Sequence, residues 1–216
     1  MHERILGRPL ATQGRQNEMM EILKTEIAMT AARLVVEEGL DYGAAKRRAV
    51  RQLELPARTA LPDNDAVEQA VLEYIALFYA ETQPRELLAL RRLALLWMQR
   101  MAIFRPHLGG SVWHGSATRL SEIYIQLFCD DCKSAEIALI DHGVKYVAHT
   151  MTGFHGKPVE ALSLNAYCPD FNDMAAVHLM IFDHDDVRGA LRPDAKGRAP
   201  RGDMAALTRL LHDQHL

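Results

Sequence analysis

A glycine turn followed by an acidic strand is the feature of this sequence best suited to chemistry. Gly109, Gly110 and Ser111 come directly before a segment typical of a short helix, and Glu122 then opens a strand. Glycine lets backbone N–H groups approach a phosphate closely, and the amino end of a helix favours negative charge. A carboxylate is a suitable oxygen ligand for a divalent cation. These residues therefore predict a nucleotide-binding turn with a metal ligand beside it.

The segment GGSVWHGSATRLSEIYIQLF resembles the signature of the nucleotidyltransferase superfamily, which has the polymerase-beta-like fold. In that family a strand ends in Gly-Gly or Gly-Ser, a short helix follows, and the next strand carries Asp-hydrophobic-Asp. Gly110 and Ser111 match the first element, and residues 121–125 fall where the acidic strand belongs. The resemblance covers residues 104–185 and implies an α/β domain that binds a nucleotide or another polar small molecule at the glycine turn.

The resemblance also implies a metal site, but this sequence keeps only part of it. Two carboxylates two residues apart on a strand share a face, where they can hold the divalent cations needed for transfer. Glu122 takes the first position, whereas Tyr124 takes the second and is a poor magnesium ligand at neutral pH. Asp183 is the nearest candidate for a third carboxylate on a neighbouring strand. We therefore expect Glu122 and Asp183 as catalytic residues and Mg²⁺ ligands in a degraded site, with weak or absent transfer activity.

Two further clusters have both a functional and an ordinary interpretation. Cys129 and Cys132 form a CxxC motif that could serve redox chemistry, or bind zinc together with Cys168 and a histidine. The ordinary interpretation is that these cysteines are incidental residues at the start of a helix. The acidic run at residues 183–186 could likewise bind a metal or polar substrate, or form a solvated turn.

A basic run in the first half of the chain supports an alternative from another class of protein. Basic residues on a short helix can neutralise DNA phosphates, although they more often form a solvated face. The surrounding stretch is similar to the DNA-binding end of tetracycline-repressor-type regulators, except that Pro56 and Pro62 occupy the place of the third helix. The alternative is a non-enzymatic regulatory or interaction protein whose helical half dimerises or contacts DNA. The basic residues concerned are Lys46, Arg47, Arg48 and Arg51.

Hydrophobic periodicity predicts the elements that must position these residues. Apolar residues at three- and four-residue steps favour four helices in the first half of the chain. After Pro106 the pattern changes to strand, helix, strand, helix, three strands and a closing helix. The four helices are expected at residues 17–39, 41–53, 63–78 and 84–101, and the later strands at 121–128, 145–153, 159–167 and 175–182.

These elements predict an α+β protein in which a helical domain precedes a small mixed-sheet domain. We expect a flexible arm at residues 1–16, a helical domain at 17–103 and the nucleotidyltransferase-like α/β domain at 104–216. The leucine-rich fourth helix would either pack on the α/β part or support self-association as a homo-oligomer.

Composition limits the remaining classes. The chain has 216 residues, 25% of them charged, and a net charge of -3, which gives no general argument for nucleic acid or membrane binding. It has no signal-peptide pattern or apolar run long enough to span a bilayer, and only three cysteines, so we expect a cytoplasmic protein. There is no GxxxxGK[ST] loop of P-loop ATPases. Neither a GxSxG elbow nor a Ser/His/Asp ordering suggests a hydrolase.

Overall fold

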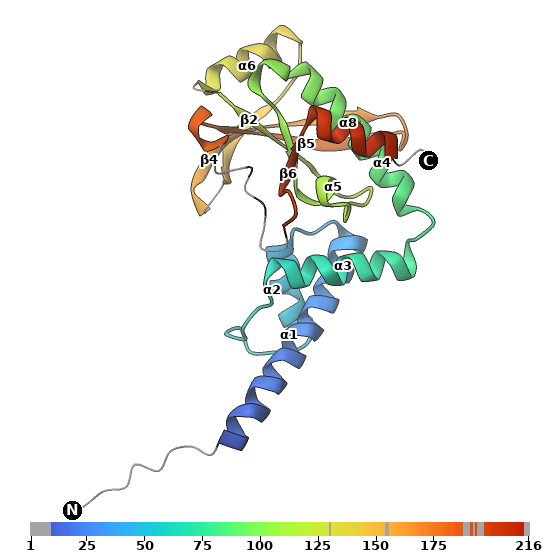
Figure 1. Ribbon diagram of the computed structural model, residues 1–216, viewed down its shortest axis with the longest axis vertical. Helices are drawn as coiled ribbons and strands as arrows, with labels where there is room; N and C mark the ends of the chain where they lie inside the picture. The colour runs from blue at the N-terminus through green and yellow to red at the C-terminus, as the bar shows by residue number, and fades with distance from the viewer. Residues whose placement is uncertain are drawn as a thin grey trace, which may run out of the picture. The chain divides into compact units, whose positions relative to one another are not determined.

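The computed structural model describes residues 10–129, 131–153, 156–187, 191, 193 and 197–213 (Figure 1). The chain divides into two compact units between Phe78 and Tyr79, and each is described by itself. A helical first unit and a sheet-containing second unit confirm the predicted mixed α/β class.

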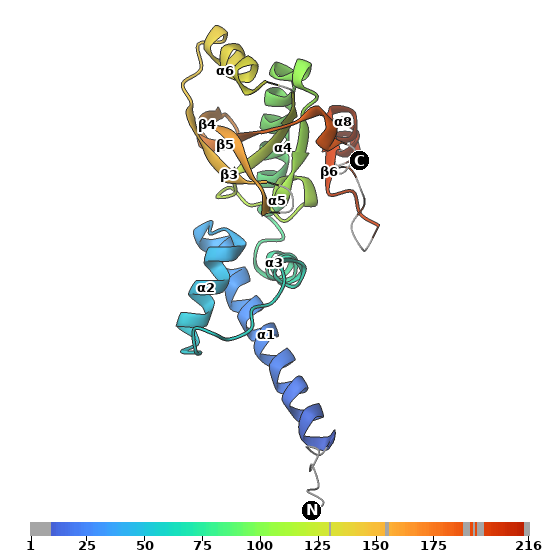
Figure 2. The ribbon, with the colours of Figure 1, turned by 90° about the vertical axis from the view of Figure 1, so that its left-hand side faces the viewer.

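The described part of the first unit consists of three helices, and its core lies along the second half of the first helix. These helices are α1 (Leu10–Glu38), α2 (Tyr42–Gln52) and α3 (Asn64–Phe78). The Asp41 side chain accepts a hydrogen bond of 2.8 Å from the Ala44 N–H, which caps α2. The N-terminal half of α1 extends past α2 and α3 (Figure 2). Because α1 begins at Leu10, the expectation of a flexible arm is wrong for residues 10–16, and residues 1–9 lie outside the described part.

In the described part of the second unit, six strands form one mixed sheet in the order β3-β4-β5-β2-β1-β6. The central pair, β2 and β5, is parallel, and every other pair is antiparallel. The strands are β1 (His107–Gly109), β2 (Ile123–Phe128), β3 (Val147–Thr152), β4 (Pro158–Cys168), β5 (Asp173–Phe182) and β6 (Arg201–Asp203). The helices are α4 (Gln83–Arg100), α5 (Gly110–His114), α6 (Cys132–Asp141) and α8 (Met204–Asp213), with short 3₁₀ turns at η1 (Ala102–Phe104) and η3 (His184–Asp186).

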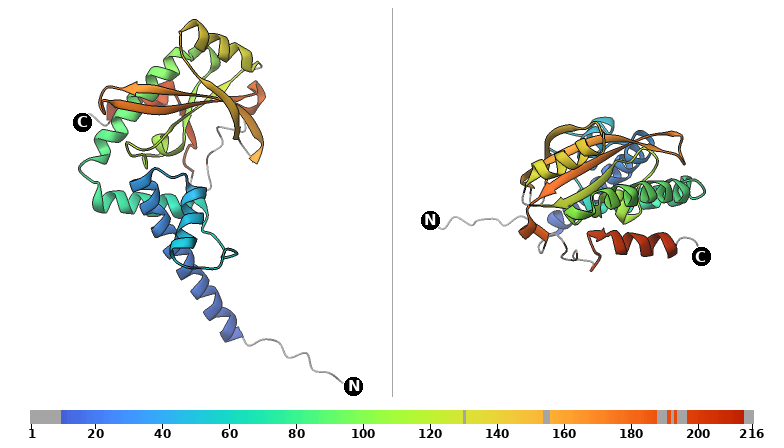
Figure 3. Two further views of the ribbon diagram at one scale, coloured as in Figure 1. Left: turned by 180° about the vertical axis from the view of Figure 1, so that it is seen from behind. Right: turned by 90° about the horizontal axis from the view of Figure 1, so that it is seen from above.

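The alternating side chains of the strands give the sheet two different faces. One face packs against α4, α6 and α8 and forms the main core; viewed from above, α4 lies between α6 and α8 (Figure 3). The apolar residues of the core face on β2 and β5 are Ile123, Ile125, Leu127, Ala175, Val177, Leu179 and Ile181. Tyr124 and His178 alternate along β2 and β5 with these buried aliphatic residues, so their side chains lie on the other face.

The boundary between the units differs from the predicted one because α4 belongs to the sheet unit. Leu90, Trp97 and Met98 of α4 are buried in the same core as the strands. The division therefore lies between residues 78 and 79, before the fourth helix and not after it. The short strand β6 was not predicted.

Helix α4 also fixes the position of the loop that follows the glycine turn. The Arg91 guanidinium, only 5% exposed, donates 3.0 Å hydrogen bonds to the carbonyl oxygens of Val112 and Trp113. Burial lowers the pKa of Arg91. The Gln83 amide donates to the carbonyl oxygens of Gly115 and Ala117, at 2.9 and 2.8 Å. Buried side chains therefore hold α5 and the loop to the body of the sheet unit.

The close approach of Trp113 to β6 gives a test of this arrangement. The indole N–H donates a 2.8 Å hydrogen bond to the Ala199 carbonyl, and a Cβ added at Gly202 would lie 2.2 Å from ring carbons. We expect Gly202→Ala to lower the free energy of unfolding by about 1–3 kcal/mol, because the ring or strand must shift. Urea denaturation measures the change. Adding Trp113→Leu should recover part of the loss, and equal stability of Gly202→Ala and wild type would contradict the packing.

Candidate functional site

The structure places the predicted glycine turn directly beside the predicted acidic strand. Gly109 ends β1 and is the cross-strand partner of Tyr124 on β2. Gly110, with a φ of +67°, turns the chain into α5, whose second residue is Ser111. A Cβ at Gly110 would lie 3.5 Å from Cδ2 of Tyr124, so the turn passes close to the tyrosine ring. The predicted order of strand, glycine turn, short helix and strand is confirmed.

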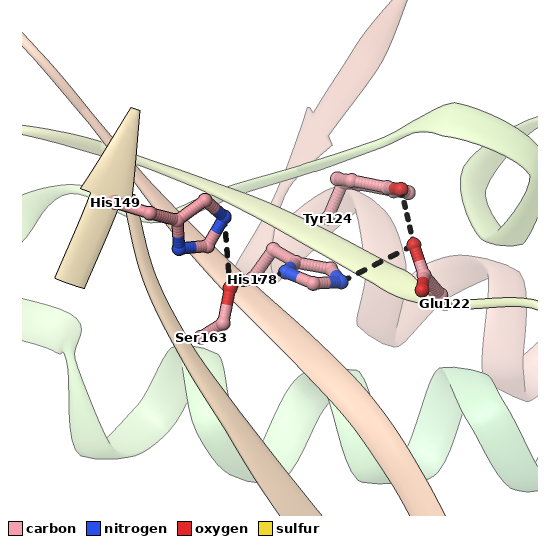
Figure 4. Close-up of polar contacts among 5 residues, drawn as sticks. All are labelled: Glu122, Tyr124, His149, Ser163 and His178. Atoms are coloured by element: carbon pink, nitrogen blue, oxygen red, sulfur yellow. Dashed lines mark hydrogen bonds and ion pairs between the residues drawn. The ribbon is translucent and has the colours of Figure 1, made fainter. Parts of the chain in front are cut away.

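Five polar side chains from β2, β3, β4, β5 and the residue before β2 meet on the face opposite the main core (Figure 4). The Tyr124 hydroxyl donates a 2.5 Å hydrogen bond to Oε2 of Glu122, and His178 Nε2 lies 3.2 Å from the same oxygen. On the other side of the imidazole, Ser163 Oγ lies 2.5 Å from His178 Nδ1 and 3.5 Å from His149 Nε2. We call these five residues the polar cluster.

Strand register explains why the cluster forms. Tyr124 and His178 are partners in the parallel β2–β5 pair, and Ser163 is the partner of His178 in the antiparallel β4–β5 pair. Cross-strand partners point to the same face of a sheet, so the three side chains form a row. The rings of Tyr124 and His178 stack, with centroids 5.0 Å apart and planes inclined by 21°. The row continues beyond Tyr124 through Gly109 to its partner Arg201 on β6.

The surroundings of Glu122 keep its carboxylate ionised. The pKa of Glu122 is lowered from 4.5 to about 2, and its interaction with His178 is the largest cause. The hydrogen bond from Tyr124 also lowers this pKa, whereas burial raises it. The Glu122 side chain is 48% exposed, whereas that of His178 is only 12% exposed. Farther along the row, burial lowers the pKa of Arg201 to about 10. The cluster thus combines a persistent carboxylate with an imidazole that can accept or donate a proton.

A pocket of about 270 Å³ adjoins the cluster. Glu122 belongs to its wall, and Asn165 and Ala176 lie two residues from Ser163 and His178 on the same strands. Side chains two residues apart on a strand share a face, so Asn165 and Ala176 place part of the pocket wall on the face that carries the cluster. An Arg119–Asp173 ion pair of 3.8 Å lies at the pocket. A small polar molecule in this pocket would therefore lie next to the Glu122–His178 contact.

The predicted pairing of Glu122 with Asp183 as metal ligands is wrong. Glu122 precedes the first residue pair of β2 and β5, whereas Asp183 follows the last pair, Phe128 with Phe182. With about 3.3 Å per residue along a strand, the two carboxylates are roughly 20 Å apart and cannot share a cation. No group of three or more His, Cys, Asp or Glu side chains within the described residues is arranged to hold a metal ion. Magnesium binding stays a prediction, now without Asp183 as a ligand.

The predicted site did not include Ser163, His149 or His178, and the sequence favoured a structural role for the two histidines. His178 takes the neighbouring-strand position that the resemblance had led us to assign to Asp183. Its signal was the isolation of an imidazole within the apolar run AAVHLMIF. Ser163 gave no comparable signal, because a serine in an alternating strand is typical of any solvent-facing position.

The other predicted sites stay without a demonstrated role. Cys129 is buried at the end of β2 and Cys168 is buried in β4, while the side chain of Cys132 lies outside the described part. On the basic helix α2, the Lys46 ammonium donates to the Pro62 carbonyl and the Asn64 side chain, and Arg48 pairs with Glu38. Of the four basic residues Lys46, Arg47, Arg48 and Arg51, Lys46 and Arg48 thus have partners within their own unit. DNA contact stays a prediction.

Comparison with protein-family models, curated proteins and solved structures gives no match. Within the described residues, no helix combines the length and the apolar character needed to cross a membrane.

The lowered pKa of Glu122 predicts how the contribution of this residue to stability depends on pH. The folded protein binds the Glu122 proton only near pH 2, whereas the unfolded chain binds it near pH 4.5. The carboxylate therefore stabilises the fold above about pH 4.5, and this contribution is lost as the pH falls toward 2. We expect wild type to unfold at a higher temperature than Glu122→Gln at pH 7, with the difference shrinking between pH 5 and 3. A difference independent of pH would contradict this assignment.

Proposed function

We propose that the sheet unit binds a nucleotide, or a related phosphate-bearing small molecule, at the turn formed by Gly109, Gly110 and Ser111, and that it lacks two-metal transfer chemistry. One observation carries the proposal: the glycine turn passes close to the ring of Tyr124, whose hydroxyl is hydrogen-bonded to the Glu122 carboxylate. The residues at the two carboxylate positions of the metal site that the resemblance implies are thus hydrogen-bonded to each other, beside the glycine turn.

The glycine turn supports the binding part of the proposal. Gly109 and Gly110 have no side chains to keep a ligand away from the backbone, and the positive φ of Gly110 favours glycine there. Arg201, the partner of Gly109 on β6, places a cationic side chain on the same face of the sheet. A phosphate group is the ligand chemistry that such a turn and a neighbouring guanidinium favour together.

The polar cluster supports the absence of two-metal chemistry. That chemistry requires several carboxylates to converge on a pair of cations, which offset the repulsion between the carboxylates. Here Glu122 is the one carboxylate of the cluster, and Tyr124 and His178 supply its polar contacts. Asp183 lies at the far end of the strand pair.

Thermal unfolding with ATP, GTP, CTP and UTP, each with and without Mg²⁺, tests the proposal. A ligand that binds only the folded state adds roughly 2.7 kcal/mol when present at about 100 times its dissociation constant. We expect at least one nucleotide to raise the midpoint in the absence of metal, and Ser111→Ala to reduce the increase. Ser134→Ala, at the start of α6, is the matched control and should respond as wild type does. A midpoint unchanged by every nucleotide would exclude the proposal.

A second variant tests why transfer chemistry is absent. Tyr124→Asp places a second carboxylate two residues from Glu122 on the same face of β2 and removes the hydroxyl that Glu122 accepts from. We expect it to bind Mn²⁺ or Mg²⁺ more tightly than wild type, because the two carboxylates can now share a cation. Calorimetric titration with metal measures the gain. Tyr124→Asn, which is similar in size without the charge, is the control, and an equal metal affinity in the two variants would contradict the explanation.

A further inference from the structure

The polar cluster contains a hydroxyl, an imidazole and a carboxylate in sequence, an arrangement that the nucleotide site does not require. Ser163 Oγ lies 2.5 Å from Nδ1 of His178, and Nε2 of the same ring lies 3.2 Å from Oε2 of Glu122. A nucleophile bonded to a base, with the base oriented by an acid, is the arrangement by which serine hydrolases activate their hydroxyl on unrelated folds.

One tautomer of His178 suits its contact with Ser163. If the neutral ring has its proton on Nε2, that nitrogen lies 3.2 Å from Oε2 of the ionised Glu122 carboxylate. Nδ1 then has a lone pair and accepts the hydrogen bond that the Ser163 hydroxyl donates. In this state the serine proton already points toward the base that would remove it.

We propose that Ser163 is the nucleophile of an acyl-transfer site that hydrolyses small esters, with His178 as its general base. Glu122 acts as a positioning residue, since it reaches the reacting atoms only through the His178 ring. Nε2 of His149 lies 3.5 Å from Ser163 Oγ, so a second imidazole borders the reacting hydroxyl. This inference does not depend on nucleotide binding.

The reaction needs only the ester and water as reactants. Ser163 Oγ gives its proton to Nδ1 of His178 and forms a bond to the carbonyl carbon of the ester. The bond from that carbon to the alkoxy oxygen breaks, and the proton on Nδ1 passes to the departing alkoxide to give an alcohol. Water then attacks the acyl-serine and gives a proton to His178. The serine oxygen leaves with that proton, and the carboxylic acid is released.

The pocket beside the cluster limits the substrate class. Its volume of about 270 Å³ lies below the range of roughly 300–1,000 Å³ that holds drug-sized ligands, so it suits a short acyl group. Its wall contains the exposed side chain of Asn165, which lies two residues from Ser163 on β4. A small ester with a polar acyl chain matches a pocket of this size and lining.

Covalent labelling of the full-length chain with a fluorophosphonate probe tests the proposal. Such a probe reacts with serine hydroxyls that a neighbouring base has activated, and mass spectrometry of peptides locates the adduct. We expect one major adduct, on Ser163, and none in Ser163→Ala. His178→Asn should lose the reaction, while a cooperative thermal transition shows that it is folded. Ser134→Ala, which removes another serine of the same unit, should label at the wild-type rate.

The pH dependence of the labelling rate tests whether Glu122 positions His178, because substitution of a merely structural residue would not change it. We expect Glu122→Gln to slow labelling by roughly 10²-fold and to shift the pH at which the rate is half-maximal, with rescue by Glu122→Asp. Wild type should also release a burst of nitrophenol from a short-chain nitrophenyl ester. Absence of a Ser163 adduct in folded wild type, or a rate that His178→Asn leaves unchanged, would overturn the proposal.

Discussion

The parallel pairing of β2 with β5 is the constraint on which the rest of the sheet unit depends. It places Ile123 opposite Val177 and carries the register through to Phe128 and Phe182. In this register Tyr124 stacks on His178, whereas Glu122 and Asp183 are at opposite ends of the strand pair. A shift of one residue would move the aliphatic side chains of β5 from the core to the other face. Core burial therefore determines which polar groups meet.

Burial on one face also accounts for the polar cluster on the other. The imidazole of His178 is only 12% exposed, and a polar group in such surroundings is costly unless it has partners. Ser163 Oγ lies 2.5 Å from Nδ1 of the ring, and Oε2 of Glu122 lies 3.2 Å from Nε2. These contacts stabilise the carboxylate and restrict the ring to one orientation. A site in which several strands hold the side chains is better defined than one on a mobile loop.

Much of the fold could be predicted from sequence because its patterns are local. Asp41, Pro84 and the periodic apolar residues of the first hundred positions predicted all four helices, and alternation predicted the longer strands. The domain boundary could not be predicted this way. The leucines of α4 indicate that the helix is buried, but its partner is a sheet formed from residues that come later in the chain.

The candidate site shows the same division between local and non-local information. Gly110 and Tyr124 are joined by a short connection, and their proximity followed from the motif. Asp183 was misplaced because its position depends on the β2–β5 register, which no local pattern fixes. The contact of Ser163 with His178 depends on a second register, and neither residue has a sequence neighbour that points to the other.

The chemistry of the cluster connects the two proposals. Three converging carboxylates would repel one another unless cations lay between them, whereas a carboxylate, a phenol and an imidazole satisfy one another directly. With tyrosine and histidine beside a single glutamate, the cluster contains an imidazole in place of the further carboxylates that would hold two cations. The glycine turn lies on the Tyr124 side of the row and Ser163 on the His178 side. The proposed ligand site at the turn and the proposed acyl-transfer site at the serine thus lie at different ends of one row of side chains.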